Sequence, residues 1–282
     1  MKKSILLTIA ICSNSLFSFA QVDSSSVKNK FSFGASYGIS KPIGDFGDNH
    51  FNFVTSDNLS SLQNGSIEDI NFASILENGF AKEDNQFNLF VEYDHNEHFG
   101  AFAKWSNSAY GLHQDIVNVI AELGNQLIAN ELPISASLGV RVSDWKSNSI
   151  VLGPTARQDY NKFSVQAKAG IGILFLESPS ITLGIDQILG IPFPLDLMKV
   201  PEEKTTSFIY SLGLSAQYEV LNKTHIRLGM EYAKSKVKME NMSVQAVSQD
   251  LDIELPTGLF ESVDFDVDYQ TINFSLGLIR NL

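Results

Sequence analysis

Apolar side chains alternate with small or polar ones in the strand-like segments of this chain, and glycine repeatedly takes the polar positions. In residues 31–40 every odd position is apolar, while Gly34 and Gly38 stand among serines at the even positions. Residues 163–173 repeat the pattern, with Gly170 and Gly172 between apolar neighbours. A soluble β-sandwich gives no reason for small residues on its solvent face. A narrow transmembrane barrel does, because lipid covers the apolar face and the cramped lumen requires small side chains.

Eight segments have about the length and alternation of membrane-crossing strands, which need roughly 9–11 residues, although residues 148–158 alternate less regularly than the others. The eight segments are residues 30–40, 86–95, 98–107, 148–158, 163–176, 205–219, 224–239 and 267–281. Three short gaps alternate with four long ones, at 41–85, 108–147, 177–204 and 240–266. This spacing is typical of bacterial outer-membrane barrels. The predicted fold class is therefore all-β, an eight-stranded antiparallel transmembrane β-barrel with long extracellular loops and short periplasmic turns.

Aromatic residues on the apolar face provide an independent check, because amphipathic rings favour the two membrane interfaces. One predicted row lies at the turn side and consists of Phe31, Tyr93, Phe99, Phe163 and Tyr218. The other lies toward the long loops and consists of Tyr37, Trp105, Phe175, Phe208 and Tyr232. The two rows fit the two interfaces of one membrane.

The first residues have the pattern of a secretory signal peptide, with Lys2 and Lys3 before an apolar run and a small-residue site ending at Ala20. The predicted domains are a signal peptide at 1–20, a short periplasmic leader at 21–29 and a barrel domain at 30–282. Cys12 is the single cysteine, so the exported chain would form no disulfide. A lipid anchor at Cys12 is an alternative, but the residues before it do not form the usual lipobox. We expect localisation in the cell outer membrane.

The acidic balance excludes one class of partner. The chain has 32 acidic and 20 basic residues, a formal net charge of −12, and no basic patch that would bind nucleic acid.

Residues 115–128 place apolar side chains at helical spacing. They predict either a short helix packed over the barrel mouth or a loop that buries its own apolar stripe.

Charged residues at inward-facing positions form the candidate site. These residues are Glu92, Asp94, Lys168, Arg227 and Glu231, with Lys104 as a further member. In a narrow lumen such charges must pair, because an isolated buried charge is costly. We expect a charge-paired plug that closes the barrel. The alternative is a conduction path lined by the same side chains.

Catalytic and metal-binding patterns are weak. His225 faces inward, but Ser215 lies on another segment without a recognisable partner pattern. His95 and His98 flank a predicted turn without a closed set of metal ligands. We therefore predict no catalytic residue, no cofactor and no metal site.

The long gap at 240–266 and the strand after it are rich in carboxylates. Asp264, Asp266 and Asp268 share one strand face and could form a weak divalent-cation site. The alternative is a solubilising surface that bridges to lipopolysaccharide.

The pattern resembles the small outer-membrane β-barrel proteins of Bacteroidetes, a porin-like or OmpA/OmpX-like barrel group. The segments that carry the resemblance are Phe33–Asn49, Tyr160–Phe175 and Ser211–Tyr232. The resemblance implies an eight-stranded outer-membrane barrel in a group whose roles are mostly undefined. One departure is the end at residues 279–282, which lacks the aromatic residue that the insertion machinery reads in such barrels.

Three functions remain open from the sequence. The first is a structural or surface-interaction barrel without catalysis, the second a small porin or transporter, and the third a membrane-embedded hydrolase. The expected partners are outer-membrane lipid and lipopolysaccharide, the outer-membrane insertion machinery and an unidentified extracellular ligand, with no nucleic acid.

Overall fold

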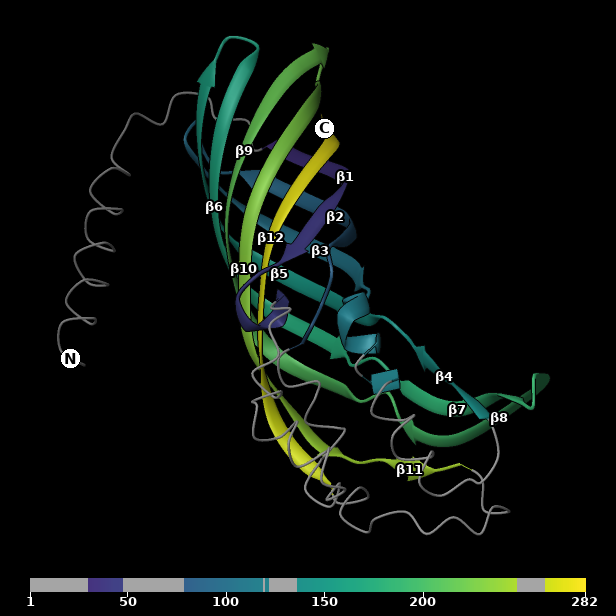
Figure 1. Ribbon diagram of the computed structural model, residues 1–282. Coiled ribbons are helices and arrows are strands. Elements are labelled where there is room, and N and C mark those ends of the chain that lie inside the picture. The colour runs from purple at the N-terminus through teal and green to yellow at the C-terminus, as the bar shows by residue number, and fades with distance from the viewer. Residues whose placement is uncertain (1–29, 48–78, 119, 122–135, 248–261) are drawn as a thin grey trace, which may run out of the picture.

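Eight antiparallel strands close into a barrel in the computed structural model, which describes residues 30–47, 79–118, 120–121, 136–247 and 262–282 (Figure 1). The barrel strands are β1 (Lys30–Pro42), β2 (Asp84–Asp94), β3 (Phe99–Tyr110), β5 (Trp145–Tyr160), β6 (Phe163–Glu177), β9 (Lys204–Leu221), β10 (Thr224–Met242) and β12 (Val263–Asn281). Each of the eight predicted segments corresponds to one of these strands, with residues 95 and 98 just outside β2 and β3. The largest shift of a boundary is at the start of β12, which begins at Val263 instead of residue 267. The predicted eight-stranded antiparallel barrel is confirmed.

Closure occurs between the first and last strands of the barrel. The β1–β12 register runs from Ser32 opposite Asn281 to Pro42 opposite Thr271. At the turn side, the Leu282 N–H donates to the carbonyl of Phe31 at 2.8 Å. The two ends of the barrel domain therefore lie with the three short turns, as Figure 1 shows for the C-terminus.

The outer wall of the barrel is apolar. Ile171 is 68% exposed and Phe208 is 85% exposed, values that water would disfavour for such large side chains but that suit a lipid-facing wall. Aromatic residues of this wall, including Phe31, Tyr93 and Trp105 of the predicted rows, also meet across strands. The rings of Phe31 and Tyr93 lie 5.0 Å apart at the turn side, and those of Phe87 and Trp105 lie 6.1 Å apart toward the loops.

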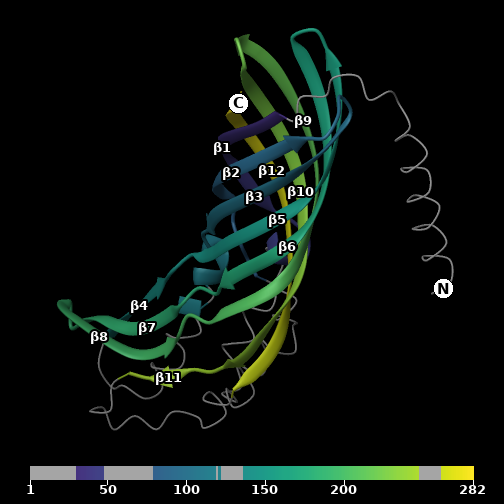
Figure 2. The ribbon, with the colours of Figure 1, turned by 180° about the vertical axis from the view of Figure 1, so that it is seen from behind.

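A second sheet corrects the prediction that three of the long gaps, at 108–147, 177–204 and 240–266, are loops. It has four strands in the order β11-β8-β7-β4 and leans away from the barrel at the end opposite the turns (Figure 2). Its strands are β4 (Ala136–Val142), β7 (Ile181–Ile188), β8 (Ile191–Val200) and β11 (Gln245–Ala246). Bulges next to Gly184 and before Gln187 interrupt the period of two, and Pro192 and Pro194 resemble loop residues. Because these features break the alternation of apolar and polar residues, the sequence pattern did not predict these strands.

One buried apolar cluster joins the second sheet to the far ends of β10 and β12. The ends contribute Val237, Met239, Phe265 and Val267. The second sheet contributes Ile181, Leu183, Ile185, Leu197, Met198 and Val200. We call these strand ends and the second sheet together the head.

The predicted helix is present in its described part, which covers residues 114–118 and 120–121. Ile116 and Ile120 are each 1% exposed and belong to the same cluster as the head core, so the apolar stripe packs against other elements. The remainder of the predicted stripe lies outside the described residues.

The predicted signal peptide at 1–20 and leader at 21–29 also lie outside the described residues. Within the described ranges, no helix combines the length and the hydropathy needed to cross a membrane.

Candidate functional site

Large aromatic side chains enter the lumen, contrary to the expectation of mainly small ones. Phe90 of β2 and Phe102 of β3 point inward and are 6% and 3% exposed. The glycines of the sequence pattern face them. A Cβ added to Gly34 would lie 2.5 Å from the Phe90 ring, and one added to Gly170 would lie 2.8 Å from the Phe102 ring. The small residues therefore provide the space that the rings occupy.

Glu92 is the centre of the main charge network. Its carboxylate, only 3% exposed, accepts hydrogen bonds from Lys168 and from Arg227, the latter at 2.5 Å. Gln166 donates to it at 3.2 Å and accepts from Arg227 at 3.1 Å. Because β2, β6 and β10 supply these four side chains, the network ties opposite walls of the barrel together.

Aromatic rings support the two cations of this network. The Lys168 Nζ lies 5.3 Å from the centre of the Phe90 ring and 5.0 Å from that of Phe102. The Arg227 guanidinium lies 4.6 Å from the centre of the Phe90 ring. Such cation–π contacts favour a positive charge where water is scarce.

The other two predicted charges form separate pairs. Glu231 binds Lys104 of β3, so it is not neutralised by Lys168 or Arg227. Asp94 lies at the turn end of β2, where Arg157 approaches it at 3.5 Å. The structure thus brings Glu92, Lys168 and Arg227 together and places Glu231 and Asp94 in neighbouring pairs.

An aromatic cluster closes the lumen at the loop end. Phe46, in the 3-10 helix η1 (Gly44–Gly47), is fully buried. Its ring centre lies 5.5 Å from that of Tyr110, 5.6 Å from that of Trp145 and 4.9 Å from that of Tyr269. The Tyr110 hydroxyl bonds to Ser40 at 2.8 Å and to Tyr269 at 3.0 Å. Buried rings with satisfied hydroxyls make a fixed plug.

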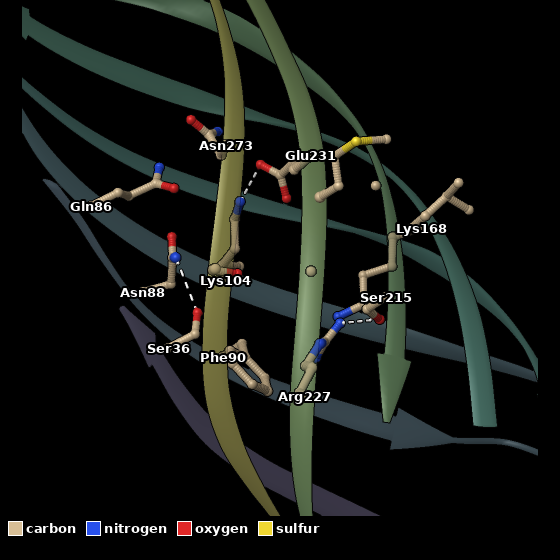
Figure 3. A pocket seen from close by; sticks show the side chains of 15 residues that line it. Ser36, Gln86, Asn88, Phe90, Lys104, Lys168, Ser215, Arg227, Glu231 and Asn273 are labelled. Atoms are coloured by element: carbon tan, nitrogen blue, oxygen red, sulfur yellow. Dashed lines mark hydrogen bonds and ion pairs between the residues drawn. The ribbon is translucent and has the colours of Figure 1, made fainter. Parts of the chain in front are cut away.

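A cavity of about 50 Å³ lies between the charge network and the aromatic cluster. Figure 3 shows Lys104 reaching Glu231 in this region, with Arg227 hydrogen-bonded to Ser215 beside them. Asn88 donates to Ser36 at 3.1 Å on the opposite wall. A cavity needs roughly 10–15 Å³ to hold one water molecule, so this one is far too small for a nutrient-sized solute.

Some members of the site were missing from the sequence-based cluster. Gln166 and Ser215 contribute hydrogen bonds to Arg227, and Phe90 contributes its ring. Phe90 occupies an inward position of the period-two pattern opposite Gly34 in the β1–β2 register. The signal that would have identified Phe90 was a large inward-facing residue paired with a glycine on the neighbouring strand.

The histidines and serines do not assemble a catalytic set in the part of the chain that the structure describes. Ser215 lies opposite Gly229 in the β9–β10 register, whereas His225 lies opposite Glu219. His95 and His98 are both exposed in the turn between β2 and β3. Among the described residues, no group of three or more potential metal ligands is found.

The acidic stripe on β12 faces lysines on β10. The pairs are Lys234–Asp268 at 2.9 Å, Lys236–Asp266 at 2.6 Å and Lys238–Asp264 at 3.4 Å. The hydrogen bond to Asp266 raises the pKa of Lys236, and the Asn241 backbone N–H lowers the pKa of the Asp264 carboxyl. Because each carboxylate already has a cation beside it, the stripe fits a charged outer surface better than a divalent-cation site.

Comparisons with known proteins found no matching family model and no matching curated protein. Among solved structures, similar chains include Ail of Yersinia pestis, with 15% identity, a TM-score of 0.41, and coverage of 91% of this chain and 100% of that one. OprG of Pseudomonas aeruginosa has 12% identity, a TM-score of 0.43, and coverage of 90% and 96%. The outer membrane protease OmpT of Escherichia coli has 9% identity, a TM-score of 0.42, and coverage of 92% and 100%.

These neighbours are outer-membrane proteins. With such low identities and with TM-scores below 0.5, the similarities carry no information on what this chain binds or does. The resemblance to the Bacteroidetes group stays a prediction.

Proposed function

We propose that this chain is an outer-membrane β-barrel protein with a structural or surface-interaction role, a lumen that does not conduct solutes, and no catalytic activity. The observation that carries the proposal is the filled cross-section of the lumen. The Glu92 network with Phe90 and Phe102 fills it at one level, and the cluster around Phe46 fills it at another. Eight strands leave little more room than such side chains occupy.

The head supports the interaction role. It packs on a buried apolar cluster that is continuous with the aromatic cluster around Phe46, and it extends beyond the aromatic row that contains Tyr232. The hairpin between β7 and β8 ends in Leu189 and Ile191, which are 70% and 67% exposed. We propose that the head faces the cell exterior, that it presents a surface to an extracellular ligand, and that the barrel wall contacts outer-membrane lipid. Contacts with lipopolysaccharide and with the insertion machinery stay predictions.

Labelling of intact cells tests the orientation. Cys12 is the single cysteine of the chain and lies in the predicted signal peptide, so exported single-cysteine variants carry one thiol. Ile191→Cys at the head should react with a membrane-impermeant maleimide in intact cells. Lys162→Cys, exposed in the turn between β5 and β6, is the matched control and should react only after the outer membrane is opened. The reverse pattern would overturn the orientation.

Recordings in planar lipid bilayers test the closed lumen. The purified wild-type protein should stay silent or show only rare, small events, because ions would have to pass side chains held in ion pairs and ring contacts. Steady, ohmic conductance would contradict the plug and would favour the small porin or transporter instead.

A further inference from the structure

The cavity in the lumen is unevenly charged. Three cationic side chains line it, namely Lys104, Lys168 and Arg227, and the carboxylate of Glu231 also lines it. Glu92 adds a second carboxylate that contacts two of the cations. Among the residues that the structure describes, this section of the lumen therefore holds three positive and two negative groups.

Both carboxylates are already engaged in ion pairs, so neither can neutralise a further positive charge. Lys104 binds Glu231, and Glu92 serves Lys168 and Arg227 together. All five side chains are poorly exposed, from 3% for Glu92 to 17% for Glu231. An uncompensated charge at such burial is costly, so the surplus positive charge favours a counterion nearby.

The walls of the cavity suit an anion in size and chemistry. Hydroxyls of Ser36 and Ser275 and the amides of Gln86 and Asn273 line it, and all four groups can donate hydrogen bonds. Its volume of about 50 Å³ accommodates a monatomic ion with water, since one water molecule needs roughly 10–15 Å³.

We propose that the lumen cavity binds one small inorganic anion of the halide class as the counterion of Lys104, Lys168 and Arg227. This inference goes beyond the proposed function, and bilayer recordings test the closed lumen separately. A silent barrel without an anion would refute only the inference, whereas a conducting barrel with an ordered anion would refute only the closed lumen.

Bromide is the probe for the test. The protein is refolded in detergent with sodium bromide or with sodium gluconate at equal ionic strength, so that the anion can enter while the barrel forms. The urea midpoint should be higher in bromide and should rise with the logarithm of the bromide concentration, because the ligand stabilises only the folded state. Crystals grown with bromide should show an anomalous scattering peak inside the cavity.

Two lysine variants locate the effect. Lys168→Met leaves one cation for each carboxylate, so the bromide dependence should be lost. Lys236→Met removes an exposed lysine on the outer wall and should keep the bromide dependence of the wild type. Equal wild-type midpoints in the two salts, or bromide-grown crystals without an anomalous peak in the cavity, would overturn the proposal. The crystallographic result on the wild type decides the question even if Lys168→Met does not fold.

Discussion

Replacing Glu92 by glutamine should destabilise the barrel more than any exposed charge substitution. The glutamine keeps the size of the side chain and removes its charge, so Lys168 and Arg227 lose the carboxylate that both contact. Breaking a buried ion pair costs about 3–5 kcal/mol, chiefly because the remaining partner stays buried without compensation. With two cations left, we expect a loss at the upper end of that range.

The measurement is urea unfolding of the refolded protein in lipid vesicles, followed by tryptophan fluorescence. The control is Asp266→Asn, which breaks the pair with Lys236, where the two side chains are 48% and 73% exposed. That change should cost about 0–1 kcal/mol, because water already screens the two charges. A Glu92→Gln loss as small as that of the control would refute the reasoning.

A double variant checks the cause of the loss. Adding Lys168→Met to Glu92→Gln removes one of the two uncompensated cations. The double variant should be more stable than Glu92→Gln alone, because the two sites are coupled and their effects do not add. If the second change instead adds its own full loss, unpaired cations are not the source of the destabilisation.

Three further changes test other parts of the structure. Leu212→Arg, on the lipid-facing wall, should cost about 2–4 kcal/mol in vesicles, and wild-type stability would contradict the assigned parity. Gly34→Ala should lower the urea midpoint because its Cβ would lie 2.5 Å from a backbone oxygen of β12, whereas Gly213→Ala, with its nearest neighbour at 3.5 Å, should not. The Asn241 N–H lowers the pKa of Asp264, so this carboxylate contributes stability above its unfolded-state pKa and loses it as pH falls through the folded-state value. Asp264→Asn should therefore reduce the decrease of the urea midpoint that occurs as pH falls from the unfolded-state pKa of this carboxyl through its folded-state pKa.

The barrel was predictable because each of its strands buries one face in the lumen and turns the other to lipid. Even β5, where the alternation is less regular, places Ser147, Ser149 and Val151 in the lumen at every second residue. Its sequence obscures this pattern because Val151 is an apolar residue at an inward position, next to the lipid-facing Ile150 and Leu152.

The arrangement of the side chains in the lumen was only partly predictable. The parity of the strands places Glu92, Lys168 and Arg227 in the lumen, but it does not say which carboxylate meets which cation. The pairing of Glu231 with Lys104 depends on how strands far apart in the sequence face each other across the barrel. The second sheet was missed because its bulges and prolines break the only periodic signal available, and its packing partners lie on distant strands.

The two longest barrel strands also determine how the protein would respond to a pulling force. β10 and β12 each have 19 residues and pair with one another from the turn side into the head. At about 3.3 Å per residue each measures roughly 60 Å, about twice the thickness of the hydrocarbon core. A load applied to the head along these strands would act on many interstrand hydrogen bonds at once instead of opening them one after another. The head is therefore coupled to the membrane by a stiff, continuous ribbon, and a ligand held there would transmit tension directly to the barrel wall.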